Sequence, residues 1–527
     1  MRGKMRLKLL AFVLMSCSSP DMELPSGHQP VTDDYDGMIV LGDRLENPYK
    51  TENITKALES LYPVKSGKVK VASTNLYVRF LPADGREFDI LLDSGIDLID
   101  HPLDYQILKE GDWYHDPEID EGQMTWQYAV VPFDFVFPDV RYEIIDECFL
   151  SENMPQTRND DGIDWNEVEK EAYRITGNGF MVNEGNTKGR GSSVPSGRIT
   201  IVDEETGGGR PFGVAGVRVS CNSFVRFDHA YTDRDGYYTM NRSFSSDLRY
   251  RLVFKNERGF SLGFNLILIP ASVSSLGKSG PDGMTANITA GVRDRLYRRC
   301  AVNNSAYDYY ARCSSDDLDI VLPPSDLRIW IFDGLDASSA VMLHHGAVLD
   351  NDKIKGFLGG FASILKFILP DITLGTRNID DYKRLYSTVC HELAHASHFS
   401  VAGTDFWNKY IYYIISSYLR TGGMTYGDGE SANAGYCAVG EMWAYYMESL
   451  MYKDRYGGGF PSFGTSYWFY PQILRMLDER GISCSRLFSV LNDEVNSHDR
   501  LKAALVSSFP LERMLIEQVF SRYNVTP

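Results

Sequence analysis

Two histidines one helical turn apart, in the segment His391-Glu392-Leu393-Ala394-His395, constrain this chain more than any other feature. Residues 379–401 around them predict one long helix, whose acidic first residues suit the positive end of a helix. A period of about 3.6 residues places both imidazoles on one face, where they can bind a single metal ion. Glu392 projects beside them, and the chain has only 10 histidines. The pattern therefore predicts a metal site, against the alternative of two histidines that only pack in a core.

A third metal ligand has to come from elsewhere in the chain, because a catalytic site needs three protein ligands beside an open position. Position 401 is Val401, which excludes a third histidine ten residues after His391. His398 shares the face but lies roughly 10 Å along the helix axis from His391, so we expect a surface or supporting role for it. A second helix predicted over residues 439–452 supplies Glu441 as the expected third ligand. The other candidates are Glu448, as the fallback, and then Glu430 and Asp428.

The two motifs together, His391 to His395 and then Gly440-Glu441-Met442-Trp443-Ala444, resemble the metal-binding helices of gluzincin zinc metallopeptidases. The resemblance implies Zn²⁺ held by His391, His395 and Glu441, with Glu392 as the general base in the hydrolysis of peptide bonds. Thermolysin-like members place an Asp four residues after the ligand Glu, where this chain has Tyr445. A different residue must therefore orient the histidine.

The hydrolysis implied by this resemblance also needs a donor for the developing oxyanion. Tyr445 is the expected donor, with His398 and Tyr436 behind it. The resemblance further implies a peptide or protein substrate laid along an edge strand, for which residues 371–375 are the candidate. One alternative is a catalytically inactive zincin-fold surface lipoprotein that binds a glycan or protein, although an intact Glu392 favours the enzyme. Another is an N-terminal domain that covers the site as a prosegment.

The first 17 residues predict an export signal with a lipid attachment site. Four basic residues precede the apolar run 9–15, which is too short for a transmembrane helix of about 20 residues. The next residues, Leu14-Met15-Ser16-Cys17, resemble the lipobox of bacterial lipoproteins, with an ordinary secretory signal as the alternative. We therefore expect an outer-membrane lipoprotein of the bacterial cell envelope, anchored through Cys17, with residues 18–35 as a flexible tether. Asp21 and Glu23 favour exposure at the cell surface.

Charge and length exclude other classes of protein. The chain carries 53 Lys+Arg against 71 Asp+Glu, a net charge of −18 that becomes −22 if residues 1–16 are removed. An acidic chain is poorly suited to neutralise phosphates, so we expect no nucleic-acid partner and no membrane contact beyond the Cys17 anchor. Its 527 residues suggest about three domains at roughly 100–200 residues each.

Changes in pattern along the chain predict a multidomain α+β fold. Residues 36–155 predict a mixed N-terminal domain, with strands that include 88–92, and residues 156–194 a linker with a short helix. Residues 195–258 carry the patterns V-x-G-V-x-V, T-D-x-D-G-Y-Y and Y-x-L-x-F, and so resemble the carboxypeptidase regulatory-like domain, which implies a small β-sandwich without an active site. Residues 259–527 predict a mainly helical, zincin-like metallopeptidase domain, with helices that include 337–348 and 500–522.

Seven cysteines follow Cys17 at irregular spacings and without a C-x-x-C pair. A thiolate zinc site is therefore not expected. Cys300 and Cys313 are the pair that we expect to be able to form a disulfide across a short polar loop, with buried free thiols as the alternative.

Overall fold

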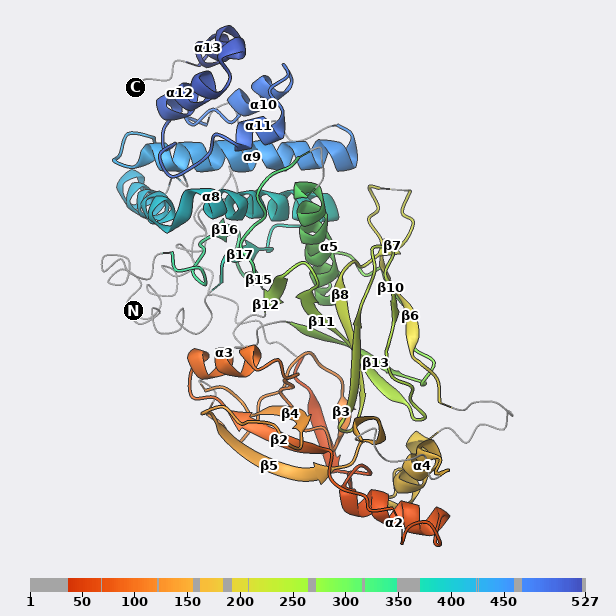
Figure 1. Cartoon of the computed structure of the whole chain (residues 1–527). Helices are drawn as coiled ribbons and strands as arrows, with labels where there is room; N and C mark the ends of the chain where they lie inside the picture. The colour runs from red at the N-terminus through yellow and green to blue at the C-terminus, as the bar shows by residue number, and fades with distance from the viewer. Residues whose placement is uncertain are drawn as a thin grey trace.

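The computed structural model is a multidomain α+β chain, which confirms the fold class predicted from the sequence (Figure 1). The expected signal peptide, Cys17 and the tether lie outside the described residues. Within the described ranges, no helix combines the length and hydropathy that a bilayer crossing requires. Those ranges are residues 37–67, 69–120, 123–154, 162–182, 192–206, 208–263, 272–314, 318–347, 370–422, 424, 426–458 and 467–523.

The N-terminal part contains a three-stranded antiparallel sheet in the order β4-β2-β5 and a two-stranded sheet of β1 and β3. Residues 88–92, expected as a strand, belong instead to helix α3, because the Asp84 side chain caps the helix by accepting from the N–H groups of Arg86 and Glu87. The elements are β1 (Val40–Arg44), α2 (Thr51–Leu61), β2 (Asn75–Leu81), α3 (Gly85–Asp93), β3 (Tyr105–Lys109), β4 (Gln127–Pro132) and β5 (Arg141–Cys148).

Helix α4 (Trp165–Ile175), which the sequence predicts as a short helix, packs against α2 and so belongs to the N-terminal part. Ile54 and Leu58 of α2 share a buried cluster with Val168 and Ala172 of α4. The helix begins at an Asp164 cap and presents these apolar residues on one face.

The next part is a β-sandwich whose two sheets share one buried core. The strand order is β10-β6-β14 in one sheet, with β7 beside β6, and β9-β8-β11-β13 in the other. Asp233 forms a turn between β9 and β10, in which its Oδ1 accepts from the N–H groups of Asp235 and Tyr237. The strands are β6 (Ser196–Ile201), β7 (Phe212–Gly213), β8 (Val217–Ser223), β9 (Arg226–Tyr231), β10 (Tyr237–Thr239), β11 (Leu248–Asn256), β13 (Val273–Ser279) and β14 (Ala286–Ile288).

One sheet of the sandwich continues without a break into the part that carries the histidine motif. β11 pairs with β12 (Phe260–Gly263), which is followed in order by β15 (Leu327–Phe332), β17 (Ile372–Gly375) and β16 (Ser339–Ala340). The expected domain boundary at residue 258 therefore lies between two paired strands, joined through Lys255 and Ser261.

Residues 337–347 form the strand β16 and turns, and the helix expected there is wrong. Pairing with β17 and a hydrogen bond from Trp407 Nε1 to the Ala340 carbonyl, at 2.8 Å, hold this segment extended. Long-range pairing therefore overrides the local helical pattern.

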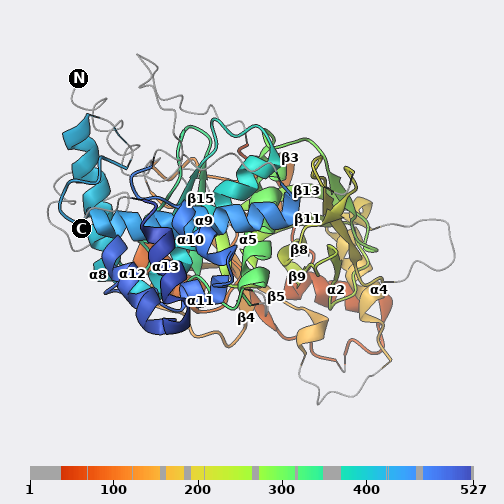
Figure 2. The same ribbon diagram turned by 90° about the horizontal axis from the view of Figure 1, so that it is seen from above.

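Two long helices, α8 (Tyr382–Thr421) and α9 (Ala434–Tyr456), pack against each other, with α8 next to the sheet and α9 beyond it, and α10–α13 cover the outer side of α9 (Figures 1 and 2). α8 changes direction at Gly403, whose φ is 75°. The single helix expected over 500–522 is interrupted at Pro510. The remaining helices are α5 (Arg295–Cys313), α10 (Gln472–Asp478), α11 (Cys484–Phe488), α12 (His498–Ser508) and α13 (Arg513–Phe520).

The expected pairing of Cys300 with Cys313 is wrong, because both lie on α5 and not across a loop. A separation of 13 residues on one helix is roughly 20 Å, far beyond the reach of a disulfide. Among the described residues, the cysteines at 148, 221, 300, 313, 390, 437 and 484 are buried free thiols.

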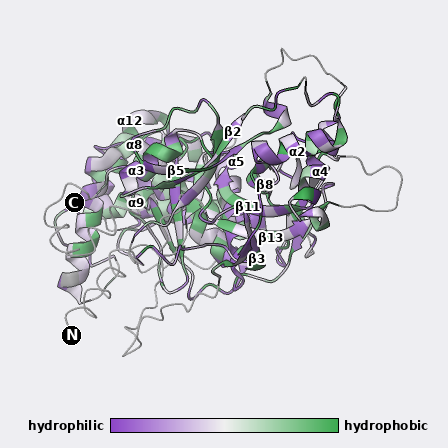
Figure 3. Ribbon diagram, turned by 90° about the horizontal axis from the view of Figure 1, so that it is seen from below, coloured by the Kyte–Doolittle hydropathy of each residue, from purple (hydrophilic) through white to green (hydrophobic). Residues whose placement is uncertain are grey.

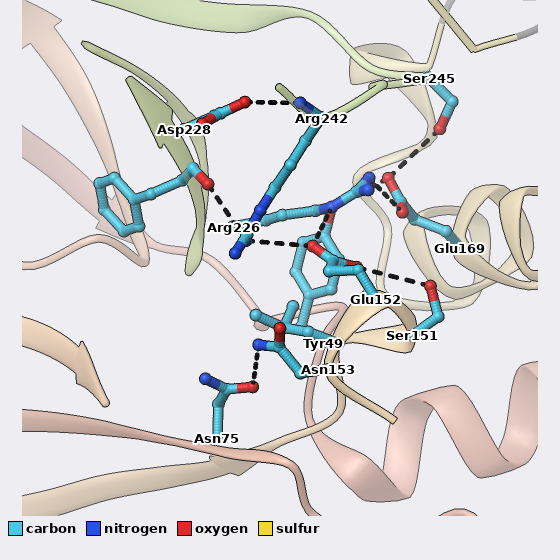
Figure 4. A network of polar contacts seen from close by, with 12 residues as sticks. Tyr49, Asn75, Ser151, Glu152, Asn153, Glu169, Arg226, Asp228, Arg242 and Ser245 are labelled. Carbon is cyan, nitrogen blue, oxygen red and sulfur yellow. Dashed lines mark hydrogen bonds and ion pairs between the residues drawn. The ribbon is translucent and has the colours of Figure 1, made fainter. Parts of the chain in front are cut away.

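Acidic residues of the N-terminal part pair with arginines from residues 218–328. Figure 4 shows one of these contacts, in which Arg226 lies between Glu152 and Glu169, at 2.9 and 2.8 Å, and the Tyr49 hydroxyl donates to Glu169. Buried pairs of this kind fix two parts against each other, since loss of one partner leaves an uncompensated charge. The pairs with a half-exposed acid are Asp89–Arg328, Asp97–Arg218 and Glu110–Arg249, and the others are Asp112–Arg295, Asp112–Arg299, Glu152–Arg226, Glu152–Arg242 and Glu169–Arg226.

Candidate metal centre

The structure brings His391 and His395 of α8 together with Glu441 of α9. One ligand atom from each residue lies within 4.8 Å of the others, and all three side chains are buried. His391 Nε2 is 3.5 Å from Glu441 Oε2, and His395 Nε2 is 3.6 Å from Glu441 Oε1. This group could hold a metal ion, with one carboxylate and two imidazoles as ligands.

Local sequence explains why these side chains meet. α8 begins at Asp381, whose side chain accepts from the Arg384 N–H, so the histidine motif lies well inside a stable helix. On α9, Gly440 faces the ring of Tyr410 on α8, where an added Cβ would lie in ordinary contact, 3.4 Å from two ring carbons. The two helices are in contact at the level of Glu441, whose Oε1 accepts from the Tyr410 hydroxyl.

Several buried atoms at this centre have no hydrogen bond within the described part of the chain. They include His391 Nε2, His395 Nε2 and both carboxylate oxygens of Glu392. Buried polar atoms in folded proteins are nearly always satisfied, so this group calls for a bound species. A metal ion on the two imidazoles, with Glu392 beside it, fits these atoms.

The electrostatics of the group favour a cation. Burial lowers the pKa of His391, but contacts with the carboxylates of Glu441 and Glu448 outweigh it and raise the pKa to about 10. Burial and the charge of His391 hold the pKa of His395 well below its usual range. Burial, together with the charges of Glu441 and Glu448, raises the pKa of Glu392 to about 8. The carboxyl groups of Glu392, Glu441 and Glu448 thus lie close together, with too little positive charge nearby to keep all three ionised.

Glu448 lies behind His391 and is not a ligand in this arrangement. Its Oε2 is 3.0 Å from His391 Nδ1, on the far side of the ring from Glu441. A carboxylate accepts, so this contact keeps a proton on Nδ1, and Nε2, which faces Glu441, is the nitrogen that could bind a metal in place of its own proton. Glu448 therefore orients the His391 ring by this hydrogen bond, whereas Tyr445 contacts His391 only through its ring.

Tyr410 is a residue of the centre that the sequence does not reveal. Its hydroxyl donates to Glu441 Oε1, and it belongs to the half of α8 that follows the bend at Gly403. Trp407, one turn earlier, packs its ring 5.7 Å from that of His395. The region contains many tyrosines, so no local pattern distinguishes Tyr410; only the bend brings it back to the ligands.

Tyr445 contacts the centre through its ring, which lies 4.7 Å from the ring of His391. Its hydroxyl is hydrogen-bonded to those of Tyr426 and Tyr467, at 2.9 and 3.1 Å. Burial raises the pKa of Tyr445 well above its usual value, so the phenol is a neutral donor. Its role as the oxyanion donor remains a prediction.

The other candidate donors and ligands lie apart from this group. His398 is buried, not on the surface: its ring packs against Phe406 and Trp407, and burial lowers its pKa to about 3. The Tyr436 hydroxyl contacts Lys409 Nζ and Asn496 Nδ2. Asp428 forms an ion pair with Arg420, and Glu430 is exposed beside it.

The strand expected to bind the substrate, residues 371–375, is not at an edge. β17 pairs with β15 on one side and with β16 on the other, so β16 is the end of this sheet in the described structure. The edge nearest the centre is therefore Ser339–Ala340.

Comparison with known proteins adds little to this geometry. No protein-family model and no curated protein matches the chain. Among solved structures, the crystal structure of (S)-allantoin synthase is similar at 15% identity and a TM-score of 0.12, over 24% of this chain and 47% of that one. A TM-score this low does not support a shared fold or function. The metal centre is therefore inferred from its own residues.

Proposed function

We propose that the chain is a zinc-dependent peptidase of the gluzincin type. The observation that carries the proposal is the buried group of His391, His395 and Glu441, with the uncompensated carboxylate of Glu392 next to it. Two imidazoles and one carboxylate form a ligand set that suits Zn²⁺ and leaves a position open for chemistry. When bound, Zn²⁺ supplies a Lewis acid that polarises a carbonyl.

Glu392 is the residue to which we assign the proton transfers. Its carboxylate accepts the proton of the attacking water and returns it to the leaving amine. A cation on the neighbouring histidines favours the ionised carboxylate, which lowers its pKa from the raised value of the metal-free site. Glu448 holds the His391 ring in place, and Tyr410 holds Glu441. Tyr445 is our candidate for the hydrogen bond to the oxyanion.

The substrate in this proposal is a peptide or protein outside the cytoplasm. The export signal and the Cys17 anchor would place the enzyme in the bacterial outer membrane, on its periplasmic or its surface side, of which Asp21 and Glu23 favour the surface. The alternative, an inactive zincin-fold lipoprotein that binds a glycan or protein, keeps the fold and the ion but not the hydrolysis.

The test combines metal analysis with one substitution. The purified chain should contain about one equivalent of zinc, because three buried ligands form a single site. Glu392→Gln should retain that zinc and lose hydrolysis of a peptide library by at least about 100-fold, whereas Glu430→Gln, at an exposed site, should change neither. Zinc below about half an equivalent would exclude the metal proposal. Full hydrolysis by Glu392→Gln would refute the assignment of the base.

A further inference from the structure

A cavity of about 210 Å³ lies between the N-terminal part and the β-sandwich, away from the metal centre. β3 and η2 (Gly179–Met181) form one wall, and β8, β11 and β13 the other. Figure 3 shows hydrophilic residues around β3, β11 and β13, where these elements meet. None of the residues that line the cavity belongs to the metal centre. Its volume suits a ligand somewhat smaller than a drug-sized molecule.

Arg251 of β11 brings a positive charge into this cavity. The residue is 7% exposed, and its Nη2 lies 3.0 Å from Asn222 Oδ1 and 3.5 Å from His101 Nε2. The described residues provide no carboxylate within ion-pair distance of it. Asp100, the nearest acid in this network, instead contacts His101 Nδ1 at 2.8 Å and accepts from the Tyr114 N–H.

The lack of an acidic partner among the described residues sets Arg251 apart from its neighbours. Arg249, two residues earlier on the same strand face, pairs with Glu110, and Arg218 and Arg226 of the same sheet also pair with acids. A buried charge without a counter-ion is costly, so such groups are paired or serve a ligand. Burial and the charge of Arg249 lower the pKa of Arg251 to about 10, and the carboxylates of Asp100 and Glu110, which do not form an ion pair with it, offset this shift only in part.

The rest of the lining defines the ligand further. Lys278 stands exposed at the rim and adds positive charge, while Asp247 is the acid that lines the same cavity. The buried side chains of Leu103 and Phe224 provide an apolar wall. A ligand with one negative group and an apolar body matches both surfaces, and a planar carboxylate suits the fork of a guanidinium.

We propose that this cavity binds a small organic carboxylate, with its charged group on Arg251 and its apolar body against Leu103 and Phe224. The guanidinium then gains the counter-ion that the described residues do not supply, and Asn222 keeps it in position. The site is independent of the proposed peptidase activity, so the two can fail separately.

The test uses two probes that differ in a single group. N-acetyl-phenylalanine carries a carboxylate on an apolar ring, and N-acetyl-phenylalaninamide replaces the carboxylate with a neutral amide. Calorimetric titration of the full chain should show one saturable site for the acid, with the amide at least about tenfold weaker. Equal binding of acid and amide, or no binding of the acid up to about 10 mM, would overturn the proposal.

Two sets of variants locate the site. Arg251→Met removes the charge and keeps an apolar stem, so it should abolish binding of the acid without loss of thermal stability; retained binding would overturn the proposal. Leu108 lines the cavity but is 68% exposed, so Leu108→Glu and Leu108→Gln should both fold. The Glu variant should bind the acid at least about threefold more weakly than the Gln variant, because its charge repels the ligand.

Those two Leu108 variants decide the question even if Arg251→Met fails to fold, and equal binding by them would count against the site. The last experiment is a competition with inorganic phosphate, which carries negative charge but has no apolar body. It should compete with the acid only weakly. Competition as strong as that of N-acetyl-phenylalanine itself would refute the carboxylate assignment in favour of a site for bare anions.

Discussion

Replacement of Glu448 should weaken metal binding although Glu448 is not a ligand. Its Oε2 lies 3.0 Å from His391 Nδ1, and that contact fixes the rotation and the tautomer of the ring. Glu448→Ala leaves all three proposed ligands in place. Without the Glu448 contact, however, binding of the ion must itself fix the rotation and the tautomer of the His391 ring, which costs free energy.

The magnitude follows from the burial of the pair. The Glu448 side chain is 16% exposed and that of His391 is 1% exposed, so solvent screens the contact only slightly. A hydrogen bond to a charged group in such a site contributes about 1.5–3 kcal/mol. Since about 1.4 kcal/mol corresponds to a factor of ten, Glu448→Ala should lower zinc affinity by roughly 10–100-fold. Glu448→Gln retains an acceptor but loses the charge, so its zinc affinity should lie between that of the parent and that of Glu448→Ala.

Competition against a chromogenic chelator would give the zinc affinity of each variant. Circular dichroism would show that each variant remains folded. Glu430→Ala is the matched control, because it removes an exposed carboxylate of the same type from a loop away from the ligands. An affinity of Glu448→Ala within about twofold of that of the parent would refute the reasoning, because the orienting contact would then contribute almost nothing.

Three other predictions follow from the contacts. Tyr410→Phe should lower the free energy of unfolding in the metal-free state by about 1.5–3 kcal/mol, measured with urea, because the buried Glu441 carboxylate loses its donor. Burial raises the pKa of Asp97, but the contacts with His229 and Arg218 outweigh it and lower the pKa from 3.8 to about 2. The ionised Asp97 therefore stabilises the fold above pH 4, and this stabilisation is lost as pH falls to 2. The stability difference between the parent and Asp97→Asn should therefore shrink over that range of acid pH. Addition of zinc at about 1,000 times its Kd should stabilise the fold by about 4 kcal/mol, and a chelator should reverse the rise in melting temperature.

Elements with a strong local signal were predictable from the sequence. The short helix predicted within residues 156–194 follows its own periodicity and is confirmed as α4. In two other segments the local pattern predicts the wrong element, in one because of long-range strand pairing and in the other because of a helix cap. Residues 337–347 become an edge strand through pairing with β17, and residues 88–92 become helical after the Asp84 cap. Elements that depend on a distant partner cannot be read from a local pattern.

The sequence by itself determined the candidate metal ligands, which the structure brings together. His391 and His395 share a face because of the helical period, and Glu441 follows in the next long helix, so their chemistry was readable before their contact. Only the tertiary structure decided how the ligands are held. Glu448 and Tyr410 acquire their roles because two packed helices and the bend at Gly403 bring them to His391 and Glu441. Arg251 likewise looks like any strand arginine until the fold buries it without a counter-ion among the described residues.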